Sequence, residues 1–154
     1  VGGGQEFGRR SGTENVAGII GFSKALELAA AKRPQASRNM NALQHGFIAQ
    51  LKKAIPQVEI NGSIKYRTPN NVHITIPGCD NERLLMELDE RGIVCAVGSA
   101  CSASSDEPSH VLKAIGLSDE QAESSLRFTM GRSTTPEEIT HTVTTLASLV
   151  ATST

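Results

Sequence analysis

The stretch Ser125-Leu-Arg-Phe-Thr-Met130, followed by Thr135-Pro-Glu-Glu138, decides the fold class of this chain. Apolar and polar residues alternate over 125–130, which is the pattern of a strand with one buried face. The next motif combines an N-cap threonine, a proline at the first helical position and a glutamate that completes a capping box. We therefore expect a strand and then a C-terminal helix, whose apolar face carries Ile139, Val143, Leu146 and Val150.

Upstream of this stretch, apolar spacing and capping residues predict alternating helices and strands. Ser11 with Glu14, or Thr13 alone, should cap the first helix, and Asp80 should cap a later one. Pro108 should occupy the first turn of a short helix. Ser118 and Gln121 should form a capping box. Proline at 34 and 56 punctuates the second helix. The predicted helices span 14–32, 37–54, 81–91 and 108–115, and the predicted strands span 58–60, 72–76 and 93–97. This order predicts an α/β, α+β-like small domain, with helices packed on a small sheet.

Composition favours one modest globular domain of 154 residues. The chain is 38% hydrophobic and 20% charged, and its net charge of -1 argues against an electrostatic nucleic-acid or membrane partner. It has neither an apolar run of about 18 residues nor a signal peptide. We therefore expect a cytoplasmic protein. The glycine-rich start without methionine suggests a piece of something longer.

Cys101 is the first candidate for chemistry. It lies among small residues over 98–105, directly after the apolar run 92–97. A thiol on such a tether can meet a substrate and then an acceptor, provided that nearby charge makes it a thiolate. The alternative is a loop cysteine of no consequence. Cys95 is expected in the core and Cys79 at a turn, and the three spacings fit neither a disulfide framework nor a metal site.

Two further features of the sequence are candidates for binding an anion. The glycine-rich segment 1–13 carries Arg9, Arg10, Ser11 and Thr13 ahead of a helix, where backbone N–H groups and the helix dipole favour negative charge. Arg127 lies within a strand, and a guanidinium is the natural fork for a carboxylate. An ordinary turn and an exposed strand arginine are the alternatives. The sequence indicates structural or exposed roles for His73 and His141, and at most a supporting role near Cys101 for His110.

Taken together, these motifs strongly resemble the cysteine desulfurases. The resemblance is carried in register over nearly the whole chain, by Gly2-Gly-Gly-Gln-Glu-x-Gly-x-Arg-Ser-Gly-Thr13-Glu-Asn, Pro69-Asn70, Gly98-Ser-Ala-Cys101-Ser, Glu107-Pro-Ser-His-Val-Leu112 and Ser125-Leu-Arg-Phe-Thr-Met-Gly-Arg132-x-Thr-Thr135-x-Glu-Glu138. It implies homodimers of the aspartate aminotransferase fold (fold type I) that depend on pyridoxal 5'-phosphate (PLP). The chain looks like their C-terminal domain over 1–154.

The resemblance also implies a reaction. L-cysteine would bind to PLP, the Cys101 thiolate would attack the substrate sulfur, and alanine would leave a persulfide on Cys101 for a sulfur-acceptor protein, such as an iron–sulfur scaffold or a thiolation carrier. Arg127 matches the arginine that holds the substrate carboxylate. Thr13, in the 1–13 turn, matches the threonine that reaches the PLP phosphate of the other subunit. Cys101, in the 98–106 loop, matches the persulfide-bearing cysteine.

One departure from the family pattern concerns the cofactor lysine. In the family this lysine follows a histidine upstream of the glycine-rich turn, and no His-Lys dipeptide occurs here. The six lysines present fall in segments that match other parts of the family. We therefore expect the isolated chain to bind no PLP covalently and to have no turnover.

Other functions remain compatible with these residues. Selenocysteine lyase shares the family's fold and cofactor. A non-enzymatic persulfide carrier or docking module would use Cys101 alone, although a simple carrier needs neither Arg127 nor Thr13. A folding domain without independent activity is the last alternative.

Overall fold

The computed structural model describes residues 2–98 and 108–152 of the chain. The chain divides into two compact units, Val1–Ala36 and Ser37–Thr154. Among the described residues, no helix is both long enough and apolar enough to cross a membrane.

The first unit contains the 3₁₀ turn η1, Glu6–Gly8, and the beginning of helix α1, which spans Val16–Ala54 and continues into the second unit. Asn15 caps α1, because its Oδ1 accepts a hydrogen bond of 3.0 Å from the Gly18 N–H. The expectation that Ser11 or Thr13 caps this helix was therefore wrong. The asparagine directly before the first helical residue is the better placed acceptor.

Helix α1 replaces the two helices expected on either side of Pro34. Proline lacks an N–H and removes one bond from a helix, yet here Pro34 lies inside α1 without ending it. Strong helix formers surround it, with Ala29, Ala30, Ala31 and Lys32 on one side and Ala36 and Arg38 on the other. Their combined propensity explains why the helical pattern continues through the proline.

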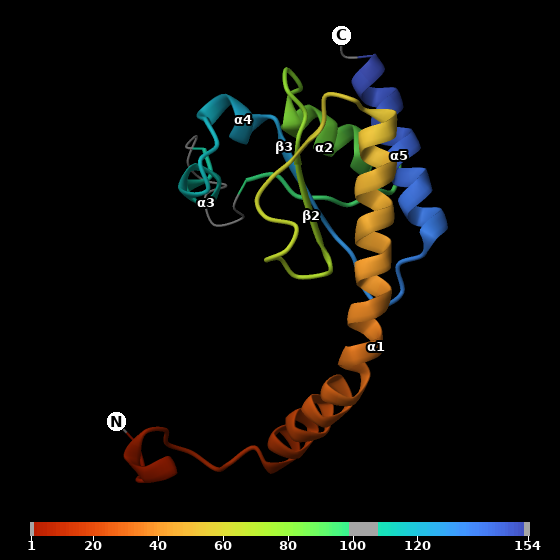
Figure 1. The fold of residues 1–154 in the computed structure, drawn as a ribbon. Helices are drawn as coiled ribbons and strands as arrows, with labels where there is room; N and C mark the ends of the chain where they lie inside the picture. The colour runs from red at the N-terminus through yellow and green to blue at the C-terminus, as the bar shows by residue number, and fades with distance from the viewer. Residues whose placement is uncertain (1, 99–107, 153–154) are drawn as a thin grey trace. The chain divides into compact units, whose positions relative to one another are not determined.

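The second unit is built on a three-stranded antiparallel sheet in the order β1-β2-β3 (Figure 1). Its strands are β1, Glu59–Ile60, β2, Asn71–Thr75, and β3, Ser125–Thr129. The register pairs Ile74 with Leu126 and His73 with Arg127. Apolar residues thus share one face of the sheet and polar residues the other, as the alternating sequence predicts.

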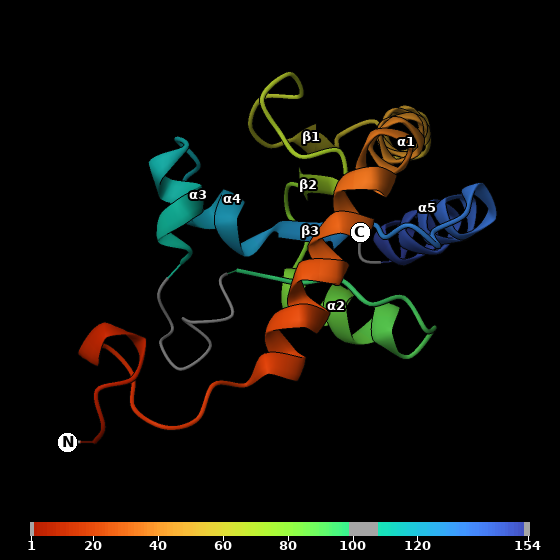
Figure 2. The same cartoon turned by 90° about the horizontal axis from the view of Figure 1, so that it is seen from below.

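The apolar face is covered by the second-unit part of α1 and by α5, Pro136–Ala151, which lie side by side (Figures 1 and 2). Phe47 of α1 and Phe128 of β3 meet edge to face, with ring centroids 5.3 Å apart. Leu51, Leu126 and Leu146 are completely buried around them. Fully burying one such side chain contributes about 1.5–3 kcal/mol, so this layer stabilises the sheet that carries Arg127.

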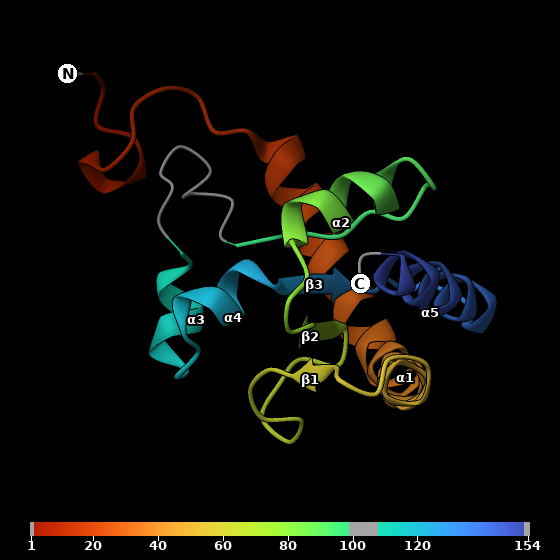
Figure 3. The same ribbon diagram turned by 90° about the horizontal axis from the view of Figure 1, so that it is seen from above.

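Three shorter helices complete the described part of the second unit. Helix α2, Asn81–Asp89, packs on α5 and β3, while α3, His110–Ala114, packs on α4, Asp119–Glu123 (Figure 3). The Asp80 carboxylate accepts from two backbone N–H groups at the start of α2. Ser118 and Thr135 form the capping boxes of α4 and α5. These caps confirm the starts predicted for all three helices, 81, 119 and 136.

Two further expectations about local structure were wrong. Residues 93–97 form no strand, because only Ala96 pairs, in an isolated bridge to Arg127. The apolar run there serves the core instead, through Ile93, Cys95 and Val97. Pro108 does not occupy the first helical turn either, since Ser109 is the N-cap of α3 and Pro108 precedes it.

Candidate functional site

The polar face of the sheet carries Arg127 at the middle of β3. Its neighbours Leu126 and Phe128 are buried on the other face, whereas Arg127 is exposed. Its backbone is fixed by two bonds to Ala96: the Ala96 N–H donates to the Arg127 carbonyl at 3.0 Å, and the Arg127 N–H donates to the Ala96 carbonyl at 2.8 Å. Within 2–98 and 108–152, the guanidinium has no hydrogen bond or ion pair. A rigid backbone thus presents an unpaired cation.

His73 of β2 is the direct cross-strand neighbour of Arg127. The carbonyl of His73 accepts from the Asn61 N–H, and Arg127 uses both backbone groups on Ala96, so the two residues form a pair without hydrogen bonds between them. In antiparallel sheets this type of pair brings the side chains closest, with Cβ atoms about 4.5–5.5 Å apart. The imidazole and the guanidinium therefore lie beside each other on the polar face.

A buried hydrogen-bond network holds the His73 ring. The Asn61 amide nitrogen contacts His73 Nδ1 at 2.9 Å and donates to Ser125 Oγ at 3.2 Å. The Asn61 amide oxygen accepts from Thr75 Oγ1 at 3.0 Å. Burial, and then the charges of Arg127 and Arg67, lower the pKa of His73 from 6.5 to about 4. The ring is consequently neutral at pH 7.

Arg67 lies in the loop between β1 and β2 and adds a second cation near His73. Its Nη2 donates to the Asn61 carbonyl and its Nε to the Ser63 carbonyl, the latter at 3.2 Å. Its Nη1 is buried without a partner in the described part of the chain, and burial lowers the Arg67 pKa. Two guanidinium groups therefore flank one neutral imidazole, and no described carboxylate pairs with either of them. This arrangement favours an anion.

The predicted site residue Thr13 belongs to the first unit. Arg10 Nη1 donates to the carbonyls of Gly12, at 3.0 Å, and Thr13, at 2.9 Å, and Gly12 has a φ of 94°, which glycine adopts without strain. The Thr13 hydroxyl makes no hydrogen bond to the described residues and is exposed. The turn thus presents a free hydroxyl. The structure describes Thr13 and Arg127 in separate units.

Cys101 lies outside the described residues, as does most of the 98–106 loop. The other two cysteines are poorly suited to nucleophilic chemistry. Burial and then the charge of Asp89 raise the pKa of Cys95 to about 11, and burial also raises the pKa of Cys79. Their thiols stay protonated at neutral pH. His110 and His141 are exposed, and the described residues contain no cluster of side chains that could hold a metal ion.

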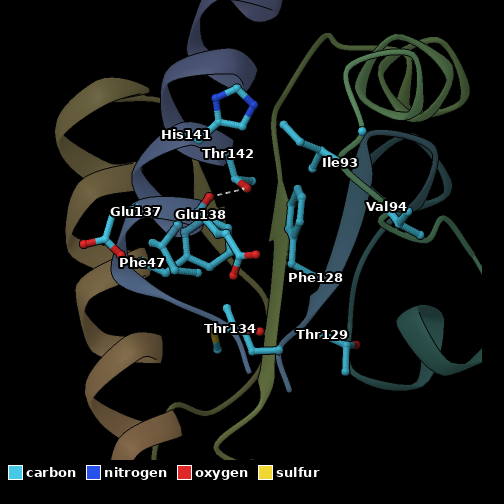
Figure 4. Close-up of a pocket in the computed structure, with 13 residues that line it drawn as sticks. Phe47, Ile93, Val94, Phe128, Thr129, Thr134, Glu137, Glu138, His141 and Thr142 are labelled. Atoms are coloured by element: carbon cyan, nitrogen blue, oxygen red, sulfur yellow. Dashed lines mark hydrogen bonds between the residues drawn. The ribbon is translucent and has the colours of Figure 1, made fainter. Parts of the chain in front are cut away.

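A separate cavity of about 480 Å³ lies between α5 and the end of β3. Figure 4 shows Phe47, Phe128 and Ile93 at its apolar wall, and Glu138 turned toward Phe128. Glu138 already works in the α5 capping box, where its Oε2 accepts from the Thr135 N–H at 2.8 Å. Neither Thr13 nor Arg127 lines the cavity. The cavity is therefore distinct from the anion-accepting face.

Sequence reasoning identified Arg127 but gave His73 only a structural or exposed role, and it did not single out Arg67. The signal for His73 was present in the alternation of β2, which places it on the same face as Asn71 and Thr75. Arg67 had no comparable signal, since the position of its guanidinium depends on how the loop folds onto Asn61.

Comparison with known proteins identifies relatives over almost the whole chain. The family model for class-V aminotransferases matches residues 4–141. Cysteine desulfurase IscS of Dictyoglomus turgidum is 43% identical over 149 residues, which is 97% of this chain and 38% of that protein. The Methanosarcina thermophila protein of the same name is 45% identical over 138 residues, or 90% of this chain and 34% of that protein.

Solved structures give the same result for the fold. A NifS-like protein from Rickettsia africae has a TM-score of 0.82 and 32% identity, over 98% of this chain and 39% of that one. A further NifS-like protein has a TM-score of 0.82 at 27% identity, over 97% of this chain and 38% of that one. The expected fold is thereby confirmed. The chain spans somewhat more than a third of the length of these relatives.

Proposed function

This chain belongs to the class-V aminotransferase family, and from that membership we propose that it is part of a PLP-dependent cysteine desulfurase. In this proposal the chain holds the substrate carboxylate through Arg127 and carries the sulfur-accepting thiol, Cys101. The observation that carries the proposal is the double backbone pairing of Arg127 with Ala96. Ala96 lies five residues before Cys101 in the sequence, and five residues of extended chain span at most about 18 Å.

The residues present fit one end of PLP only. The Thr13 hydroxyl, which has no partner among the described residues, suits a contact to the cofactor phosphate. All six lysines are exposed, and Lys24 and Lys113 already pair with Glu27 and Asp119. None of them follows a histidine, as the cofactor lysine does in the family. When bound, PLP supplies an electron sink that weakens the Cβ–Sγ bond of cysteine.

The chain's own residues would then act in two ways. Arg127 would hold the L-cysteine carboxylate through a bidentate, charge-assisted pair and so fix the direction of the substrate sulfur. The Cys101 thiolate would form a bond to that sulfur while the Cβ–Sγ bond breaks. The electron pair of the broken bond stays on Cβ, which takes a proton and becomes the methyl group of alanine. Cys101 keeps the sulfur as a persulfide.

Three further features belong to the same proposal. We expect the persulfide to pass to a sulfur-acceptor protein, because a product bound to the chain must leave for the next cycle. We also expect a homodimer, in which Thr13 reaches the PLP phosphate of the other subunit. The composition continues to favour a cytoplasmic location.

Replacing Arg127 tests the carboxylate contact. In the complete, PLP-loaded polypeptide, Arg127→Gln should raise KM for L-cysteine by about 10- to 100-fold, because a hydrogen bond to a charged group contributes about 1.5–3 kcal/mol. Steady-state alanine formation measures this change. Arg91→Gln is the matched control, since Arg91 is exposed just beyond α2 and its guanidinium donates to the Glu87 carbonyl. An unchanged KM in Arg127→Gln would contradict the proposal.

A further inference from the structure

His73 has the position needed to share a ligand with Arg127. The two residues are paired across β2 and β3, and both side chains lie on the polar face of the sheet. The backbones of His73 and Arg127 make no hydrogen bonds to each other, so the two residues form a non-hydrogen-bonded pair. In such a pair the side chains lie closer together than in a hydrogen-bonded pair. An anion bound by the guanidinium would therefore lie next to the imidazole.

The hydrogen-bond network sets which ring nitrogen can donate. Asn61 uses its amide oxygen on Thr75 and its amide nitrogen on Ser125 and His73 Nδ1. With the amide in this orientation, Nδ1 is the acceptor, and the proton of the neutral ring lies on Nε2. Nε2 has no hydrogen-bond partner among residues 2–98 and 108–152, and it is not among the buried unsatisfied atoms there. The ring thus offers an accessible N–H.

The charges around His73 explain why a neutral donor suits this place. Arg127 faces the ring from β3 and Arg67 faces it from the β1–β2 loop, and both disfavour an imidazolium. The network partners Asn61, Thr75 and Ser125 carry no charge. A protonated ring would add a third positive charge to this face. A neutral ring adds a donor without that repulsion.

We propose that His73 is a substrate-binding residue whose Nε2–H donates to the carboxylate of an amino-acid substrate held by Arg127. The inference rests on the proposed function, because it takes the anion at Arg127 to be that carboxylate. The Asn61 network holds the ring in place, so the donor needs no rearrangement when the substrate binds. Arg127 supplies the positive charge, and the Nε2–H of His73 supplies a hydrogen bond that orients the carboxylate.

The test compares ligands with and without the carboxylate. L-alanine and L-alaninamide are titrated into the complete, PLP-loaded polypeptide, and the absorbance of the bound cofactor reports equilibrium binding. His73→Leu should weaken the binding of L-alanine by about 10-fold or more, because it removes a hydrogen-bond donor to a charged group. The affinity for L-alaninamide should change less than about twofold in the same variant. His73→Asn, which keeps an N–H donor, should recover most of the L-alanine affinity. His141→Leu makes the same change at an exposed histidine and should alter neither ligand.

The outcomes separate this inference from the proposed function. If His73→Leu weakened the binding of both ligands equally, His73 would have only a structural role. Unchanged binding of L-alanine would show that His73 makes no contact with the carboxylate. Arg127→Gln must itself weaken the binding of L-alanine more than the binding of L-alaninamide. If it does not, the carboxylate site and the proposed function are both wrong. His73→Phe fills the ring volume without a donor and replaces His73→Leu should that variant not fold.

Discussion

At the scale of single residues, the polar sheet face combines two cations with a neutral ring. Arg127 and Arg67 have no carboxylate partner among the described residues, and His73 lies across from Arg127. The Arg67 Nη1 is buried without a partner in the described part of the chain, and an unpaired buried charge costs free energy, so this arrangement points to a ligand that completes it. The same charges also make the stability of the fold depend on pH.

Titration of His73 should weaken the fold in mild acid. Its pKa is about 4 in the native state against 6.5 for an ordinary histidine. Between these values the unfolded chain binds a proton that the native chain does not, so the free energy of unfolding falls as pH falls from 6.5 to 4. We expect His73→Phe to reduce this loss by an amount on the order of 1–2 kcal/mol, allowing for solvent screening at the half-buried ring. Denaturant titrations at pH 7 and pH 4.5 measure it.

The control for this prediction is His141→Phe. His141 is exposed on α5, so its replacement should leave the pH dependence as it is in the parent. If His73→Phe and the parent lost equal stability between the two pH values, His73 would titrate normally, and the electrostatic description of the polar face would be wrong.

The resemblance to the cysteine desulfurases predicted Arg127 as a site residue, whereas the strand pattern alone left open whether its side chain faces solvent or a polar pocket. The sequence could not predict that His73 pairs with Arg127, since register depends on how two segments more than fifty residues apart align. It could not predict the buried Nη1 of Arg67 either, because that depends on the path of the β1–β2 loop. The role of Cys101 stays a prediction.

At the scale of elements, caps decide where the helices of the second unit begin. In α5 the Thr135 hydroxyl accepts from the Glu138 N–H at 3.2 Å, and Glu138 Oε2 accepts from the Thr135 N–H at 2.8 Å. Thr135→Ala removes the hydroxyl and should lower the free energy of unfolding by about 1 kcal/mol. Chemical denaturation measures the loss.

Thr144→Ala provides the comparison on the same helix. The Thr144 hydroxyl bonds back to the Thr140 carbonyl at 2.9 Å, and the residue is exposed. Alanine is the better helix former there, so this variant should be neutral or slightly more stable. A loss in Thr144→Ala as large as that in Thr135→Ala would show that helix propensity, not the cap, sets the stability of α5.

Local chemistry explains which elements were predictable. The starts of α2, α4 and α5 follow from motifs within four residues, and these were predicted. The division at Pro34 failed because helix propensity on both sides outweighed one missing N–H. The strand expected at 93–97 failed because an apolar run has the same pattern whether it pairs or only packs on a core. The stripe Val16, Ile19, Ile20 and Leu26 predicted a helix, yet it is exposed in the first unit.

At the scale of the whole molecule, the proposal assigns holding of the substrate carboxylate to Arg127 and acceptance of the sulfur to Cys101. The sheet positions Arg127, and the segment that follows Ala96 carries Cys101. Thr13 lies in the first unit, and its contact to the cofactor of another subunit remains part of the proposal. The chain covers 38% of the IscS protein of Dictyoglomus turgidum. Activity must therefore be measured on the complete polypeptide.

The most direct test of the account is cysteine-dependent formation of alanine and sulfide by the complete, PLP-loaded polypeptide, with and without Cys101. The account predicts that Cys101→Ala falls to background while keeping its bound PLP. Cys79→Ala, which removes a buried thiol whose pKa is raised, should stay close to the parent. Equal activity in Cys101→Ala and the parent would place the sulfur chemistry elsewhere, and the central claim would be wrong.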